Sequence, residues 1–143
     1  MNLRAFTMSL AVVPAIAFGH AVVTPADSGL SQTQQYTLHV PNEKDVPTVA
    51  VELLFPAEID VTTVDEQEGW QLLLTRDSKR RITSATWMGS LAPKTSARFT
   101  FTAQNSARPV SVAWNVVQTY DGVIVEWTGE PGSKTPASRT NIH

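Results

Sequence analysis

His20 is the residue of this sequence whose position gives it more chemistry than its side chain alone. It follows Ala17 and Gly19, small residues of the kind that precede a signal-peptidase cut. Cleavage after Gly19 gives His20 a free α-amine beside its imidazole, and two neutral nitrogens so placed can chelate a transition metal. A histidine inside a chain has no such amine. The sequence therefore makes metal binding depend on processing.

Residues 1–19 have the three regions of an export signal peptide. Arg4 and the initiator amine give a positive start, residues 5–16 are mostly apolar, and the segment ends in small residues. The apolar run is shorter than the roughly 20 residues of a membrane-spanning helix. We therefore predict export to the periplasm or secretion, rather than a buried N-terminal strand or a membrane anchor. Gly19 and Ala21 form a second small pair, and a cut there removes His20.

The sequence contains few of the motifs that catalysis or nucleic-acid binding would need. The chain has no cysteine, so it can form neither a disulfide nor a thiolate metal site. It also lacks a Gly-x-Ser-x-Gly nucleophile motif and a glycine-rich phosphate loop. A net charge of −2 without a basic block argues against nucleic acid as a partner. His39 alternates with Leu38 and Val40, which predicts a surface position, and His143 ends an unpatterned stretch that we expect in solvent.

The elements that position these residues are predicted to be strands. Apolar residues recur with a period of two in short segments, and turn residues separate them. The expected strands cover 21–23, 35–40, 49–55, 59–64, 70–74, 83–87, 97–103, 110–116 and 123–127. A break is expected at 88–90, and Asp121-Gly122 predicts a tight hairpin. The pattern favours one antiparallel β-sandwich over 20–128, followed by an extended tail over 129–143.

The four tryptophans divide into two groups. Trp70, Trp87 and Trp114 lie in alternating apolar patterns and are predicted to belong to the core. Trp127 ends the last expected strand, and its position fits the edge of the core and the wall of a site equally well. Glu43 lies in a charged loop and, taken alone, reads as a solvated side chain.

Several blocks of the sequence match one family in order and spacing. They cover residues 20–25, 36–43, 69–70, 87, 99–101, 118–129 and 132–136. With these blocks the chain resembles the YcnI-type copper-binding domain, an exported bacterial β-sandwich. Residues 88–93 match that family's glycine-rich turn poorly. The resemblance implies an immunoglobulin- or cupredoxin-like fold over essentially the whole mature chain.

The resemblance also implies a Cu(II) site called a monohistidine brace. In that family an N-terminal histidine binds copper through its amine and ring, a glutamate adds an oxygen, and a tryptophan lies beside the metal. Carried onto this chain, these residues are His20, Glu43 and Trp127, with Glu126 as the alternative carboxylate. Nitrogen and carboxylate donors suit Cu(II), whereas Cu(I) prefers sulfur ligands.

The function implied is a non-catalytic copper carrier or store in the periplasm. Its partners are then the copper ion and other copper-trafficking proteins or a membrane copper transporter. Because this chain ends at His143, it is not expected to carry the C-terminal membrane anchor of many family members. One alternative is a copper oxidase of the polysaccharide monooxygenase type, which needs a second histidine that only His39 could supply. The other is a metal-free sugar-binding or adhesion sandwich.

Overall fold

A computed structural model describes residues 19–143, so the signal peptide predicted over 1–19 lies, except for Gly19, outside the described residues. Eleven strands form this part of the chain. In chain order they are β1 (Val22–Thr24), β2 (Asp27–Ser28), β3 (Thr33–Pro41), β4 (Thr48–Leu54), β5 (Asp60–Val64), β6 (Gln71–Arg76), β7 (Ile82–Leu91), β8 (Ser96–Gln104), β9 (Val110–Tyr120), β10 (Val123–Trp127) and β11 (Ser138–Ile142).

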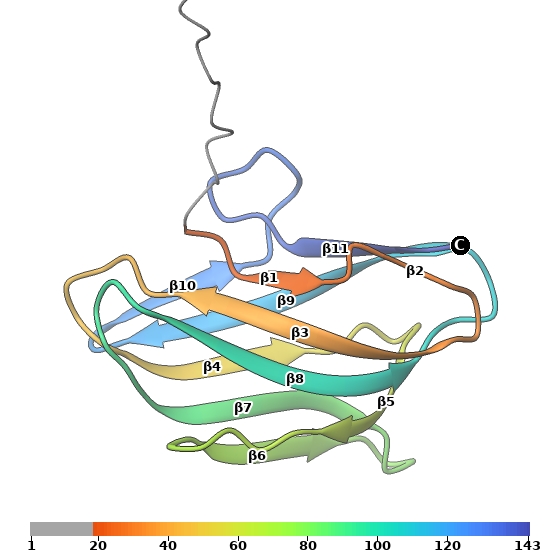
Figure 1. The fold of residues 1–143 in the computed structure, drawn as a ribbon, viewed down its shortest axis with the longest axis horizontal. Coiled ribbons are helices and arrows are strands. Elements are labelled where there is room, and N and C mark those ends of the chain that lie inside the picture. The colour runs from red at the N-terminus through yellow and green to blue at the C-terminus, as the bar shows by residue number, and fades with distance from the viewer. Residues whose placement is uncertain (1–18) are drawn as a thin grey trace, which may run out of the picture.

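The strands form two sheets that pack face to face, which confirms the predicted β-sandwich (Figure 1). The smaller sheet has the order β1-β3-β8-β5. The larger has the order β2-β11-β9-β4-β7-β6, and β10 also pairs with β9. All pairs are antiparallel except β2 with β11, which are parallel. Over residues 19–143, the chain forms no helix with the length and apolar character needed to cross a membrane.

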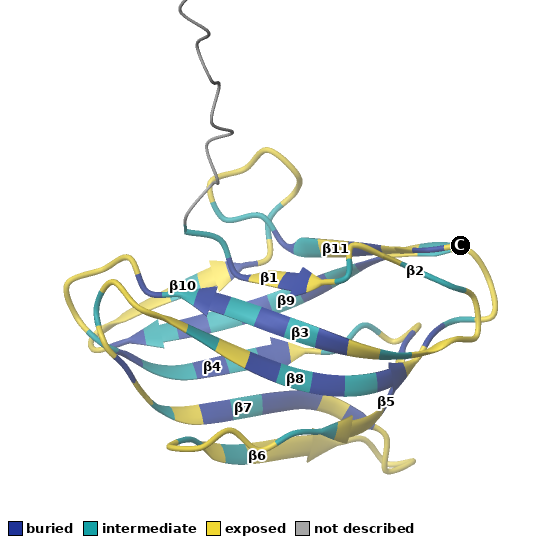
Figure 2. Ribbon diagram, viewed as in Figure 1, coloured by how far each residue is buried: buried dark blue, intermediate teal, exposed yellow. Residues whose placement is uncertain are grey.

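The core lies between the sheets and follows the alternation of the sequence (Figure 2). Trp87 and Trp114 are fully buried, as predicted, and each such side chain stabilises the fold by about 1.5–3 kcal/mol or more. Trp70 is only partly buried and meets Phe99 edge-on, with 5.1 Å between ring centroids. Among residues 19–143, the buried apolar side chains form one cluster that extends from Ala21 to Ile142.

The break predicted at residues 88–90 is wrong, because β7 runs through it to Leu91. Gly89 does not end the strand. A β-carbon on Gly89 would lie 2.7 Å from the indole of Trp70, so glycine is the residue that lets this ring pack against the strand. Glycine in a strand therefore marks a close approach here rather than a turn.

The tail predicted over 129–143 also needs correction, because residues 138–142 form β11 inside the sandwich. Thr140 and Ile142 are buried. The Thr140 hydroxyl accepts a hydrogen bond from Trp114 Nε1 at 2.9 Å and donates one to the Pro25 carbonyl at 2.8 Å. A polar residue thus occupies an inward position with its hydrogen bonds satisfied, and this hides the apolar alternation of the strand.

The long strand β9 determines where the site forms. Its first half, Val110 to Trp114, pairs with β11, and its second half, Val116 to Tyr120, pairs with β10. The other strand neighbour of the second half is β4. The hairpin predicted at Asp121-Gly122 is present, and it sets Trp127 opposite Val116. This end of the sandwich also carries the loops that follow β3 and β7 (Figure 1).

Candidate metal centre

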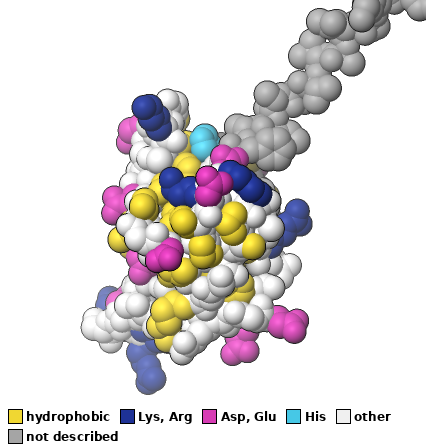
Figure 3. Space-filling model, turned by 90° about the vertical axis from the view of Figure 1, so that its left-hand side faces the viewer, with side chains coloured by type: hydrophobic (Ala, Val, Ile, Leu, Met, Phe, Trp, Pro, Cys, Tyr) yellow, Lys and Arg dark blue, Asp and Glu magenta, His cyan; other side chains and the backbone are white. Residues whose placement is uncertain are grey.

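The three residues that the resemblance singled out come together at one end of the sandwich. A pocket of about 330 Å³ is lined there by Gly19, Glu43 and Trp127, among others. Lys44, Tyr120, Val125 and Thr135 complete the lining. His20 follows Gly19 directly, and its ring centroid lies 5.5 Å from that of Trp127. Figure 3 views this end of the molecule and shows a histidine beside acidic and basic side chains.

Glu43 approaches the backbone at the predicted cleavage site. A β-carbon placed on Gly19 would lie 2.8 Å from Glu43 Oε2 and 3.4 Å from Oε1. Gly19 has a φ of +129°, which only glycine adopts readily. The nitrogen of His20 is separated from the Gly19 α-carbon by two bonds. The Glu43 carboxylate therefore lies close to the atom that becomes the α-amine after a cut at Gly19.

The loop that carries Glu43 is held by its neighbour Asn42, which is buried. The Asn42 amide donates to the carbonyls of Val46 and Leu91, at 2.9 and 3.0 Å. Its side-chain oxygen accepts from the Lys44 N–H at 2.9 Å, the geometry of an Asx turn. Lys94 donates to the Glu43 carbonyl. The backbone of the charged loop at Glu43 is thus fixed on both sides of this residue.

Trp127 is buried and fixed through a buried amide. Its indole Nε1 donates to Gln118 Oε1 at 3.0 Å. Gln118 Nε2 in turn donates to the Thr48 hydroxyl at 2.9 Å and to the Pro41 carbonyl at 3.1 Å. Gln118 therefore connects Trp127 with the end of β3, just before the loop that holds Glu43.

Sequence reasoning assigned no role to Gln118, although the sequence contains a signal for it. The inward positions of β9 are Val112, Trp114, Val116, Gln118 and Tyr120, all of which are buried. A glutamine in such an apolar series has to find hydrogen-bond partners inside the protein, because an unpaired buried amide is costly. The buried polar residue, and not the apolar ones around it, marks the nearby site.

Tyr120 and Lys44 form another side of the pocket. Lys44 Nζ lies 5.3 Å from the centre of the Tyr120 ring, in a cation–π arrangement. Burial raises the pKa of Tyr120, a hydrogen bond with Thr48 opposes that rise, and the negative charge of Glu43 adds to it. The Glu43 charge therefore acts across the pocket. Both residues lie in matched sequence blocks or directly beside one, but their types alone do not point to a site.

Glu126, the alternative carboxylate, does not line this pocket. Glu126 is exposed and lines an adjoining depression, which shares Val125 and Thr135 with the pocket beside Trp127. The arrangement brings Glu43, and not Glu126, beside Gly19 and Trp127.

The remaining histidines lie elsewhere. His39 is on the solvent side of β3 and lines a depression with Arg98 that shares no residue with the pocket beside Trp127. His143 is exposed, as expected, but it is tied to the fold, with its N–H donating to the Ser28 carbonyl and Nε2 lying 3.1 Å from Asp27 Oδ1. Within residues 19–143, no three histidine, cysteine, aspartate or glutamate side chains gather as a metal site would require.

The donors present beside Trp127 are therefore one imidazole and one carboxylate. Side chains alone make this an incomplete metal site, and the backbone nitrogen of His20 is the atom that could extend it. An amide nitrogen within a chain is a poor ligand, whereas a free amine is a good one. The donor set thus fits a nitrogen- and oxygen-bound divalent metal once the chain begins at His20.

Comparison with known proteins places the chain in a family. Residues 20–141 match the model of the domain of unknown function DUF1775. The chain belongs to the DUF1775 family. It is also 36% identical over 138 residues to the copper-binding protein CutI of Bacillus subtilis, a match that spans 94% of this chain and 67% of CutI. The resemblance to the YcnI-type domain is thereby confirmed, and the DUF1775 match includes His20, Glu43 and Trp127.

Solved structures show the same fold for this DUF1775 member. An uncharacterized protein from Nocardia farcinica with an immunoglobulin-like fold aligns with a TM-score of 0.76 at 20% identity, over 86% of this chain and 97% of that one. A cohesin–dockerin complex from Clostridium thermocellum aligns with a TM-score of 0.52 at 11% identity, over 87% of this chain and 98% of that one. At these identities the likeness concerns the fold, which is that of an immunoglobulin-like β-sandwich.

Proposed function

We propose that this protein is an exported Cu(II)-binding protein that carries or stores copper through an N-terminal histidine. The name of its relative CutI supports copper as the cargo. The observation that carries the proposal is the position of Glu43, whose carboxylate lies beside Gly19 while the ring of His20 lies beside Trp127. Three parts of the chain that are distant in sequence thus surround the predicted cleavage site.

Each residue then has a distinct task. After removal of residues 1–19, the His20 amine and the near ring nitrogen bind the metal as a chelate. Glu43 supplies an oxygen and a negative charge that compensates part of the charge of Cu(II). Trp127 covers one side of the site and limits access of solvent. It is not a metal ligand, because its indole nitrogen is a hydrogen-bond donor that is already bonded to Gln118.

The proposed role is transport or storage rather than catalysis. A brace with two histidines, as in copper-dependent oxidases, needs a second imidazole, and His39 lines a different depression from that of Trp127. We place the protein in the periplasm or outside the cell. Its proposed partners are the copper ion and the periplasmic proteins or membrane transporter that exchange copper with it.

The decisive experiment compares two forms of the protein that both begin at His20 and differ only at the α-amine. In one form this amine is free, and in the other it carries an acetyl group. We expect the acetylated form to bind Cu(II) more than about 100-fold more weakly, because acetylation turns the amine into a non-basic amide. Competition titrations against a copper chelator measure both affinities. The intact mass of the protein recovered after export shows whether the chain made by the cell begins at His20.

Equal Cu(II) affinity in the two forms would exclude the N-terminal amine as a ligand. Recovery of exported protein that begins after Ala21 would likewise exclude His20. A third form that begins at His20 but carries Ala21→Ser serves as the matched control, because it changes one residue at the same end and leaves the amine free. We expect it to bind copper like the unaltered form.

A further inference from the structure

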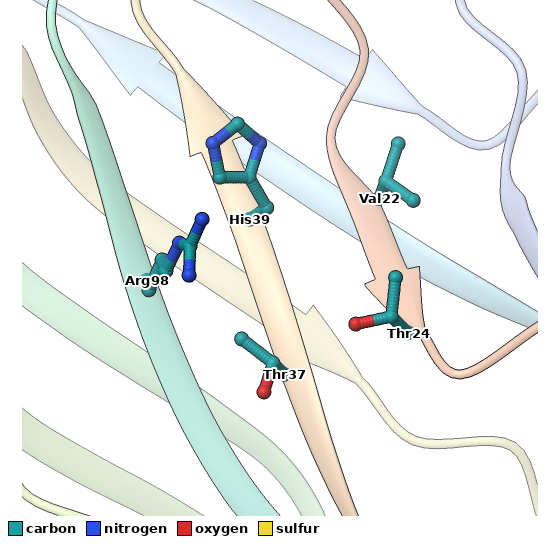
Figure 4. A pocket seen from close by; sticks show the side chains of 5 residues that line it. All are labelled: Val22, Thr24, Thr37, His39 and Arg98. Atoms are coloured by element: carbon teal, nitrogen blue, oxygen red, sulfur yellow. The ribbon is translucent and has the colours of Figure 1, made fainter.

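A second depression, of about 350 Å³, lies on the solvent side of the four-stranded sheet. Its lining comes from three neighbouring strands, with Val22 and Thr24 on β1, Thr37 and His39 on β3, and Arg98 on β8 (Figure 4). It shares no lining residue with the pocket beside Trp127. The proposed copper site does not use any of these five side chains.

The strand register arranges these residues in two adjacent rows. Val22 pairs with His39, and His39 pairs with Arg98, so these three side chains form one row across the sheet. Thr24 pairs with Thr37 in the next row. The residues between the rows are buried in the core, so both rows face solvent. These inward residues are Val23, Leu38 and Phe99.

The lining groups are all hydrogen-bond donors or apolar, and none is a carboxylate. Arg98 has no carboxylate within ion-pair distance among residues 19–143, unlike Arg81 with Asp60 or Arg139 with Glu130. Burial lowers the pKa of His39, and the positive charge of Arg98 lowers it further. The lining of the depression therefore carries the positive charge of Arg98 and no negative charge, and the Asp65 carboxylate nearby on this face is bonded to the Thr100 hydroxyl.

We propose that this depression binds an oxyanion, either a carboxylate or a phosphate group. The guanidinium of Arg98 offers parallel N–H groups that match two oxygens of such an anion. The His39 ring can donate a further N–H, and Thr24 and Thr37 offer hydroxyl groups. Val22 adds an apolar contact for the carbon skeleton of an organic acid. The proposal is independent of the copper site and stands if that site fails.

The same features argue against a metal cation at His39. A fixed positive charge beside an imidazole repels a divalent ion, and the lining offers no carboxylate to offset it. His39 pairs with Val22 on β1 and with Arg98 on β8. Of these two cross-strand neighbours, Arg98 is the charged one.

The test uses the metal-free protein from residue 20 to 143 and the proton resonances of His39, assigned with a His39→Gln variant. Inorganic phosphate and citrate are each titrated at constant ionic strength, with sodium chloride as the reference salt. We expect a saturable shift of the His39 resonances and a rise of its pKa by roughly half a unit or more, because a bound anion stabilises the protonated ring.

Three variants decide whether the shift comes from this depression. Arg98→Gln removes the guanidinium and should abolish the saturable response. Thr37→Val keeps the shape of a β-branched side chain and should weaken binding several-fold. Arg108→Gln removes an exposed arginine in the loop after β8 and should leave the response unchanged. Circular dichroism confirms that each variant is folded.

A response to phosphate alone assigns the site to tetrahedral anions, and a response to citrate alone assigns it to carboxylates. Both results support an oxyanion site, as does a response to both probes. The proposal is overturned if neither probe gives a saturable shift at concentrations of tens of millimolar, which are far above the Kd of a useful binding site. It is also overturned if Arg98→Gln and the unaltered protein respond alike.

Discussion

Two histidines on this sandwich have the same side chain and opposite surroundings. His20 lies beside an indole and follows a glycine that meets the carboxylate of Glu43. His39 lies on a sheet face beside the guanidinium of Arg98, with hydroxyl and methyl groups around it. The first histidine is at the entry to β1, and the second is paired with Val22 on that same short strand.

We infer from this difference that the neighbouring charge, more than the imidazole itself, distinguishes the ligands proposed for the two histidines. A carboxylate beside an imidazole favours the binding of a cation, and a guanidinium beside an imidazole favours the binding of an anion. Sequence alone cannot separate these cases, because Glu43 and Arg98 are distant in sequence from the histidines that they accompany. Cross-strand register and loop anchoring bring each pair together.

The largest expected effect separates the two histidines by copper binding. His20→Ala should lower Cu(II) affinity by well over about 100-fold, since even residues that only orient a ligand contribute roughly 10–100-fold. His39→Ala should leave the affinity unchanged. Isothermal titration with a competing chelator measures both. An equal loss of Cu(II) affinity in the two variants would mean that both histidines bind one metal ion. The proposed difference between His20 and His39 would then be wrong.

The next effect separates the two candidate carboxylates. Glu43→Gln keeps the shape and removes the charge, so we expect a loss of roughly 10–100-fold in Cu(II) affinity and an altered electron paramagnetic resonance spectrum. Glu126→Gln is the matched control and should change neither, because Glu126 does not line the pocket beside Trp127. If Glu126→Gln alone changes the spectrum, the carboxylate ligand is Glu126 and the contrast has to be redrawn.

A smaller effect concerns the support of Trp127. Gln118→Leu leaves the indole N–H of Trp127 without a partner and removes the amide that donates to the Thr48 hydroxyl, so the free energy of unfolding should fall by about 1–3 kcal/mol. Gln35→Leu, on an exposed position of β3, should change it by less than about 0.5 kcal/mol. Urea unfolding of the metal-free variants measures both values. A Gln118→Leu protein as stable as the unaltered one contradicts the supporting role.

The smallest effect is the titration of His39. The pKa of His39 is lowered in the folded protein. At a pH between that pKa and about 6.5, the unfolded chain therefore binds a proton at His39 that the folded protein does not bind. His39 therefore makes folding less favourable as the pH falls below about 6.5. Arg98→Gln should raise the His39 pKa, yet leave it below its ordinary value, because burial is the larger cause. Proton NMR from pH 4 to 8 measures it, and an unchanged pKa would show that the Arg98 charge does not reach the ring.

The sequence was sufficient for the sandwich, because a strand with one buried face shows its period of two directly. Tyr36, Leu38 and Val40 on β3 are all buried, as the alternation predicted. The spacing of Val61 and Val64 breaks the period, and the structure shows why, since the register of β5 against β8 shifts between Val61 and Thr63.

The predictions of secondary structure were wrong where the polarity or size of a side chain depends on a partner that is distant in sequence. β11 was missed because Thr140 takes an inward position and bonds to Trp114, 26 residues earlier. The end of β7 was missed because Gly89 accommodates Trp70, the residue directly before the neighbouring strand β6. The same dependence limits the site, for which the sequence supplied His20, Glu43 and Trp127 through resemblance, while Gln118 and Asn42 became visible only as hydrogen-bond partners.

The side-chain hydrogen bonds from β11 to the segment around β1 have a consequence for the order of folding. The Val23 N–H donates to the Ser138 hydroxyl, and Thr140 donates to the Pro25 carbonyl, each across 115 residues of sequence. The segment that positions His20 is therefore held by residues that a ribosome makes 115 positions later. Contacts of such long sequence separation form late and slowly. An emerging chain lacks these contacts until β11 has been made, so we expect the region around His20 to become ordered late.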